Sequence, residues 1–335
     1  MKKFKMFMLL TLFNCSISYS TDSVRLLSWW DEPLYDYMFS TIKHSCDVDL
    51  AYQGYVESNQ FISLLESGKH WDIVVFEGTL FNMVKKNLSR DDIDINTDLK
   101  AKYPEFIRRE LRENLGDSLK YSNLTFFTIN NLVILYDPKV LNISKDTDIK
   151  SIINQLDKAN KDLVLLDDAN IISSIMEAEG YELSLRDFSE LFNYKKILIQ
   201  NYIDNYEDIG AMLIWSAFAL EYLNKVKNKG IELKIAEIPK YQFTTANYIG
   251  QLSKDENTKC VVDVLTSEDF FLRSKTTFDF TPYVNYESIS DEEFYNLYRR
   301  FYMQGSEYKL KWIDNKKNSE NIYNAWNKIL VQKGI

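Results

Sequence analysis

Tryptophans and carboxylates occur together at the predicted ends of several strands. The set comprises Trp29 to Glu32 after one apolar run, Glu77 after a second, Asp168 after a third, and Trp215 in the second half. An aromatic ring within ~6 Å attracts an ammonium ion, and a carboxylate accepts its N–H groups in charge-assisted hydrogen bonds. This combination favours a binding site for an organic cation. The alternative is that the rings belong to the core and the acids are solvated.

Residue types for catalysis are sparse. His44 and His70 lie in no zinc-binding motif and near no nucleophile signature, so we expect both at the surface. No glycine-rich phosphate loop is present. Asp167 and Asp168 are adjacent, and neighbouring strand residues point to opposite faces. The two carboxylates are therefore not expected to face one bond, as the acid pair of a glycosidase must. The spacing of Asp92 to Asn96 is that of a calcium loop, but the loop's glycine and final glutamate are missing. We expect no enzyme activity, no cofactor and no metal.

Predicted strands and helices alternate along the first half of the chain, and they would position these residues. Apolar runs at 25–30, 48–55 and 71–76 predict strands, and the patterns at 34–43 and 59–67 predict helices. Such alternation predicts a parallel sheet flanked by helices, with a ligand edge at the carboxyl ends of the strands. The acids and rings would then meet at strand tips.

A second α/β lobe is predicted from the middle of the chain. Its elements are a strand at 123–138, a helix at 148–159, a buried strand at 161–170 with a helix from 171, a helix from 208 to 229, and a strand at 231–239 that should return the chain to the first lobe. The chain should return to the first lobe near Thr244, form a helix up to about Ser267, and end in a helix at 320–332 that presents Tyr323 and Trp326 on one face. We predict that lobe 1 comprises 21–127 and 243–288. Lobe 2 would comprise 128–242 and 289–335, including the C-terminal helix.

The first twenty residues have the composition of an export signal. Lysines precede an apolar run from Met6 to Phe13, and Ser18 and Ser20 offer small side chains for cleavage near Ser20. The run is much shorter than the ~20 residues of a membrane-spanning helix. A lipoprotein would use Cys15, but the residues before it are too large or too polar for that motif. We predict a soluble periplasmic protein.

The net charge limits the classes of molecule that the protein is expected to bind. The net charge of −9 argues against nucleic acid and favours cationic ligands. Cys46 and Cys260 remain after cleavage of the predicted signal, and they form either one disulfide or two separate buried thiols.

Ordered landmarks give the chain a family resemblance. They are WWDE at 29–32, VESNQF at 56–61, WDIVVFEGT at 71–79, VLLDDA at 164–169 and MLIWSAF at 212–218. In order and spacing they resemble the spermidine/putrescine-binding proteins of bacterial ABC transporters, a branch of the type II periplasmic binding proteins. The resemblance spans almost the whole mature chain. It implies an α/β fold of two lobes, each a mainly parallel sheet flanked by helices, with two crossings between them.

The resemblance also implies roles for individual residues. Trp30 and Trp215 would sandwich a polyamine chain, and Glu32 and Asp168 would bind its amines. Phe243 stands where the family has another tryptophan. Two family acids are absent, since Thr245 and Ile171 stand in their places.

Asp31 and Glu77 are expected to compensate with negative charge from new directions. This would retain a cation but alter its length or amine spacing. The implied function is capture of a polyamine-like cation by a monomer that presents it to an inner-membrane ABC permease. The alternative partner is a membrane sensor that reports the ligand without transport. Both alternatives require closure of the lobes around the ligand.

Overall fold

The computed structural model describes residues 23–29, 32–55, 58–88, 113, 120–199, 208–227, 229–273, 281, 311–313 and 319–334. The predicted signal at 1–20 and the segment from Asp92 to Asn96 lie outside them.

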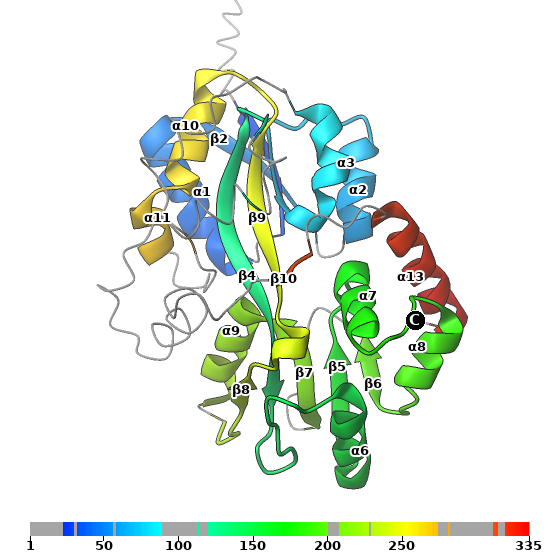
Figure 1. Ribbon diagram of the computed structural model, residues 1–335. Coiled ribbons are helices and arrows are strands. Elements are labelled where there is room, and N and C mark those ends of the chain that lie inside the picture. Colours follow the sequence, from blue (N-terminus) through cyan, green and yellow to red (C-terminus); the bar gives the residue numbers. More distant parts are fainter. Residues whose placement is uncertain are drawn as a thin grey trace, which may run out of the picture.

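The first lobe is built on strands that pair around β3. Its elements are β1 (Ser23–Ser28), α1 (Glu32–Cys46), β2 (Asp49–Gly54), α2 (Ser58–Glu66), β3 (Ile73–Glu77), the 3-10 turn η1 (Gly78–Leu80), α3 (Phe81–Val84), the 3-10 turn η2 (Lys85–Asn87), β9 (Phe243–Gln251), α10 (Glu256–Leu265), α11 (Glu268–Arg273) and β10 (Lys311–Trp312). The strands β2, β1 and β3 are parallel, and β9 runs antiparallel to β3. In Figure 1, α1, α10 and α11 lie on one side of these strands and α2 and α3 on the other.

The alternation of side chains along β3 explains why helices cover both faces of this sheet. Ile73 and Val75 of β3 belong to the apolar cluster that includes Met38 of α1, whereas Val74 and Phe76 belong to the cluster that includes Phe61 of α2. Successive side chains of a strand point to opposite faces, so both faces of this sheet are buried under helices. The predicted α/β lobe is confirmed.

The second lobe repeats the α/β design. Its elements are β4 (Leu124–Tyr136), α6 (Ile149–Ala159), β5 (Asp162–Leu165), α7 (Ala169–Ala178), α8 (Leu185–Leu191), β6 (Ile197–Ile199), β7 (Ile209–Trp215), α9 (Ser216–Lys227), β8 (Lys234–Ala236), the 3-10 turn η4 (Pro239–Tyr241) and the terminal helix α13 (Ser319–Lys333). Strands β6, β5 and β7 are parallel. Helix α13 packs on α7 and α8, and its Tyr323 and Trp326 are both buried, as predicted.

Among the described residues, the strands β4 and β9 connect the lobes. β4 pairs with β9 over its first half and with β7 and β8 over its second half, all antiparallel. Figure 1 shows β4 and β9 running side by side from the upper into the lower part of the molecule. The overall sheet is therefore mixed, with parallel outer strands and antiparallel crossings. The predicted boundary at 127/128 falls inside the continuous strand β4, that at 288/289 lies outside the described residues, and the lobe limits stay predictions.

Two predicted elements differ from the structure. The segment from residue 208 was expected to be helical, but Ile209–Trp215 forms β7 and the helix begins at Ser216. All seven residues of β7 are buried, and a continuous apolar run has no periodicity that separates strand from helix. The strand at 231–239 was expected to return the chain to the first lobe. Its core, β8, pairs instead with β4 in the second lobe, and β9 makes the return.

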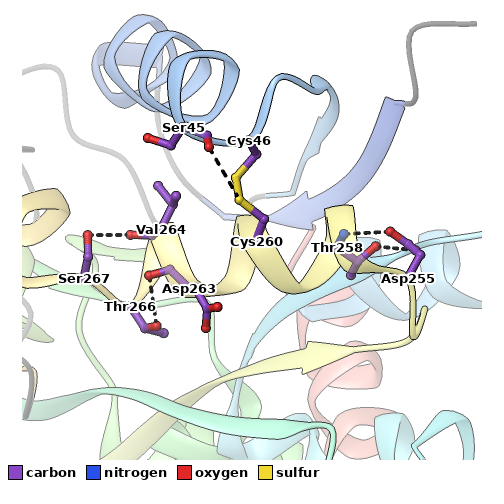
Figure 2. Close-up of a disulfide and its surroundings, with 9 residues drawn as sticks. All are labelled: Ser45, Cys46, Asp255, Thr258, Cys260, Asp263, Val264, Thr266 and Ser267. Carbon is purple, nitrogen blue, oxygen red and sulfur yellow. Dashed lines mark hydrogen bonds between the residues drawn. A yellow bond between two sulfur atoms is a disulfide. The ribbon is translucent and has the colours of Figure 1, made fainter.

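A disulfide fastens the helices on one side of the first lobe. Cys46 is the last residue of α1 and Cys260 lies within α10, and the two are bonded (Figure 2). Asp255 caps α10 by accepting hydrogen bonds from the backbone N–H and the hydroxyl of Thr258, both at 2.7 Å. The sequence left the pairing open, and the structure decides for one bond between elements far apart in the chain.

A buried tyrosine fixes the turn before β9. The Tyr241 hydroxyl accepts a hydrogen bond from the Ile149 backbone N–H at 2.8 Å and donates one to the Glu179 carboxylate. Lys240 forms an ion pair with the same carboxylate at 2.8 Å. Burial, together with the Glu179 charge, raises the pKa of Tyr241. The hydroxyl thus stays neutral and holds η4 to the start of α6.

Tyr241→Phe is expected to lower the free energy of unfolding by about 1–3 kcal/mol, because it leaves a buried N–H and a carboxylate oxygen without this partner. Urea unfolding measures the change. Tyr181→Phe is a matched control, since its hydroxyl contacts Lys150 and Glu190 in an exposed network and should change stability by less than about 0.5 kcal/mol. Equal effects of the two substitutions would contradict the role given to Tyr241.

Among the described residues, no helix combines the length and the apolar character needed to cross a membrane.

Candidate functional site

The candidate site lies where the tip of β3 faces the start of α7. Glu77 ends β3 and is half-buried, and the chain then turns through η1, whose residues are all buried. The Thr79 hydroxyl lies 3.5 Å from Glu77 Oε2 and donates to it. The carboxylate of Glu77 is thus presented at the carboxyl end of a parallel strand, which is the expected ligand edge.

Asp168 comes from the second lobe, at the tip of β5. It is the N-cap of α7, and its Oδ1 accepts hydrogen bonds from the backbone N–H groups of Asn170 at 2.8 Å and Ile171 at 3.1 Å. Aspartate is a preferred N-cap because it satisfies these free N–H groups. Asp168 is only 7% exposed. The cap therefore holds a buried carboxylate in a fixed orientation at the lobe boundary.

The two carboxyl groups meet across the boundary. A side-chain hydrogen bond joins Glu77 to Asp168. Burial raises the pKa of Asp168 above its ordinary value of 3.8, and the hydrogen bonds from Ile171, Asn170 and Glu77 oppose this rise. A hydrogen bond between two carboxyl groups requires that one of them carries a proton. The two acids thus lie in a place where positive charge, from a proton or from a cation, is favoured.

Asp167 points elsewhere, as its position next to Asp168 predicts. Its Oδ1 accepts a hydrogen bond from Trp326 Nε1 at 2.6 Å, so it is tied to α13. Burial raises the pKa of Asp167, and the bond from Trp326 opposes this. The two neighbouring acids therefore have different tasks, one at the lobe boundary and one in the packing of the terminal helix.

Tyr323 of α13 connects the elements around the acid pair. Its hydroxyl accepts a hydrogen bond from Asn170 Nδ2 at 3.0 Å and is also hydrogen-bonded to the side chains of Ser58 and Thr79. It is 5% exposed, and burial, followed by the charge of Asp168, raises its pKa. α13 also reaches α2 directly, since Asn59 Nδ2 donates to Asn327 Oδ1 at 2.8 Å. Both lobes are therefore in contact around the acids.

Aromatic side chains line the first-lobe side of the site. The Tyr55 ring packs edge-on against Trp29 at 6.2 Å, and its hydroxyl donates to the Val75 carbonyl at 2.9 Å. Burial, followed by the charges of Glu77 and nearby tyrosines, raises the pKa of Tyr55. Trp29 is half-buried beside the core. The two rings thus pack together beside β3, the strand that ends in Glu77.

Three further predicted site residues lie in the strands β7 and β9. Trp215 ends β7, opposite Leu132, and is 4% exposed in the core. Phe243 begins β9, and the Lys311 ammonium lies 5.8 Å from its ring centroid. Thr245 is fully buried in β9 opposite Asn130. Their contact with a ligand stays a prediction.

Three predicted residues at the tip of β1 can be placed only in part. Trp30 and Asp31 lie outside the described residues, and Glu32 begins α1 without a described side chain. Their roles also stay predictions.

Sequence reasoning missed Asn170 and Tyr323. Asn170 directly follows the DDA landmark, which could have marked it as part of a helix cap. Tyr323 was expected on the buried face of the last helix, but nothing in the sequence pairs that helix with α2 and η1. Such a contact depends on how the lobes meet.

A separate groove of about 400 Å³ lies on the second lobe, between the start of α8 and α13, and is lined by Leu185, Lys328 and Ile329 among others. It does not include the acid pair. Among the described residues no group of histidine, cysteine and acidic side chains could hold a metal ion.

No protein-family model and no curated protein matches the chain. Solved structures match over nearly the whole length. A putative spermidine/putrescine ABC transporter protein from Listeria monocytogenes has a TM-score of 0.68 at 15% identity, covering 93% of this chain and 99% of that one. The spermidine/putrescine substrate-binding protein of Streptococcus pneumoniae gives 0.62 at 14% identity, covering 92% and 98%.

A neighbour with a different ligand matches about as well. The GacH receptor of Streptomyces glaucescens, solved unliganded and with acarbose, has a TM-score of 0.63 at 13% identity and covers 93% of both chains. At these identities the likeness concerns the fold. The chain thus has the two-lobed fold of the periplasmic substrate-binding proteins of ABC transporters, and the structures that share it include the spermidine/putrescine-binding proteins that its sequence resembles.

Proposed function

We propose that the protein is an exported solute-binding protein that captures a polyamine-like organic cation between its lobes and presents it to a membrane permease. The observation that carries this proposal is the Glu77–Asp168 pair, in which two acids from different lobes share a hydrogen bond. A buried and a half-buried carboxyl group this close attract positive charge strongly. A protonated amine is the organic group that satisfies them.

In the proposed mechanism the ammonium group takes the place of the proton held by the pair. Both carboxylates can then be ionised, since the cation supplies the charge and the N–H donors that they need. Asp168 keeps its helix cap, because Oδ1 receives the backbone N–H groups. Asp168 Oδ2 and Glu77 would face the amine.

Closure of the lobes follows from the same contacts. The cation binds both acids at once only when the tip of β3 faces the tip of β5, so it stabilises the closed arrangement over an open one. Tyr323 and the Asn59–Asn327 hydrogen bond add contacts between the first lobe and α13 in that arrangement. Closure would form the surface on which a permease recognises the loaded protein.

The compartment is inferred from the disulfide. The Cys46–Cys260 bond persists in an oxidising environment such as the periplasm. This agrees with the export signal predicted for residues 1–20, which lie outside the described part of the chain. A periplasmic binding protein fits both features.

A thermal-shift screen of the mature protein tests the proposal. The screen compares diamines, triamines, basic amino acids and quaternary amines with sugars and anions. A ligand at about 100 times its dissociation constant should stabilise the fold by about 2.7 kcal/mol. We expect the shift with amines, and expect Trp30→Ala to weaken it greatly without unfolding the protein. A shift with sugars or anions alone would refute the cationic ligand.

A further inference from the structure

A row of polar side chains leads away from Glu77 across the strands that connect the lobes. Glu77 of β3 is paired with Asn247 of β9, which is paired with Thr128 of β4. The next row on the same face consists of Thr245 and Asn130. Residues directly opposite one another share a face, as do residues two apart in a strand. We call Glu77, Asn247, Thr128, Thr245 and Asn130 the polar face.

A direct hydrogen bond supports this assignment. Asn247 Nδ2 donates to Thr128 Oγ1 at 2.8 Å, so both side chains lie on one side of the sheet. The Glu77 end of the face meets Asp168. Two strand spacings and one further row separate Asn130 from Glu77, which corresponds to about 12 Å between their backbones. The polar face is thus as long as a small extended ligand.

Asn130 ends the polar face with an unsatisfied acceptor. Its side chain is 7% exposed, and its Oδ1 has no hydrogen-bond partner among the described residues. A buried amide oxygen without a partner costs about 1–3 kcal/mol. A group that donates a hydrogen bond to this oxygen would recover that free energy.

The polar face supplies no carboxylate for a second cation at Asn130. Of the residues that form the polar face, only Glu77 is ionisable. One row beyond Thr245, the Lys311 ammonium lies over the Phe243 ring, with which Lys311 is paired in the sheet. An ammonium beside Asn130 would lose its hydration without gaining a carboxylate from this face. An uncharged donor avoids this cost.

We propose that the ligand is an amine that carries an uncharged hydrogen-bond donor, a hydroxyl or amide group, at the end opposite its ammonium. The ammonium binds between Glu77 and Asp168, and the neutral group donates to Asn130 Oδ1. This inference rests on the proposed function, since it assigns the second end of the same ligand. It places a monocation, and not a diamine, in the site.

Calorimetric titration of the mature protein with matched pairs tests the inference. The pairs are aminobutanol and putrescine, aminopentanol and cadaverine, and aminohexanol and hexamethylenediamine. In the pair of best-fitting length, the amino alcohol should bind about tenfold more tightly or better. A diamine that binds as tightly as its amino alcohol would overturn the inference but leave the cation site standing. If neither class binds, the proposed function fails as well.

Two variants test whether Asn130 causes the preference for the amino alcohol over the diamine. Asn130→Asp adds a carboxylate at the far end, so the preference should reverse in favour of the diamine. Asn131→Asp is the control, because Asn131 lies on the opposite face and its Oδ1 accepts from Thr244 Oγ1 at 2.7 Å. This control should keep the wild-type preference. An unchanged preference in folded Asn130→Asp protein would contradict the role of Asn130, and the wild-type comparison decides the question if that variant does not fold.

Discussion

Cys260→Ser is expected to lower the free energy of unfolding by about 5 kcal/mol, because the bond closes a very long loop. Cys46 and Cys260 are 214 residues apart in the sequence. In the loop-entropy description, the bond restricts the unfolded chain more as the loop grows. The effect should be a large fall in the midpoint of urea unfolding relative to the oxidised wild type.

Further variants test whether loss of the disulfide, and not loss of a cysteine side chain, causes the destabilisation. Cys46→Ser should destabilise the protein as much as Cys260→Ser, and the double variant should add little, because both single changes remove the same bond. A reducing agent should destabilise the wild type but leave either variant unchanged. A wild type whose unfolding midpoint is insensitive to reduction would contradict this prediction.

Asp168→Asn is expected to weaken cation binding by about 2–5 kcal/mol, which is roughly a 30-fold to several-thousand-fold loss of affinity. The substitution removes one of two charges that face the amine. Asparagine is also a good N-cap, and its oxygen can accept from the same N–H groups, so α7 should stay folded. Calorimetry with the amine found in the screen measures the loss.

Asp167→Asn is the matched control for this substitution. Asp167 accepts from Trp326 on the side of α13, so its replacement should affect stability more than affinity. Equal losses of affinity from the two variants would show that total negative charge, and not the Glu77–Asp168 pair, attracts the ligand.

Affinity should also depend on pH. The pKa of Asp168 is raised from 3.8, so its contribution to the stability of the unliganded protein is present below that ordinary value. It is lost as pH rises through the raised pKa. Cation binding has the opposite trend, because the ionised acid binds the amine. Affinity should therefore rise with pH across this range in the wild type and change less in Asp168→Asn.

The spacing of apolar residues predicted an element correctly where only one of its faces is buried. The terminal helix was expected at 320–332 because Tyr323 and Trp326 recur at helical spacing, and α13 has both residues buried. In β7 every residue is buried, so the same reasoning had no period to detect. The disulfide could not be assigned either, since two cysteines give no sign of their distance in space.

The site was predictable only as far as strand ends can be located. Glu77 and Asp168 were both predicted at strand ends, and in the structure Glu77 ends β3 while Asp168 caps the helix that follows β5. Asn130 lies within a long buried strand. A single amide side chain that interrupts an apolar run gives no sign in the sequence that it belongs to a site. Its position opposite Thr245 depends on the register between β4 and β9, which connects segments more than a hundred residues apart.

We expect an organic cation to replace the proton between Glu77 and Asp168. Calorimetric titration at mildly acidic pH, in buffers of different ionisation enthalpy, counts the protons released when the amine binds. Binding should release up to one proton per amine, with less release at higher pH and in Asp168→Asn protein. Tight amine binding without proton release at any pH, or with the same release in Asp168→Asn, would contradict it.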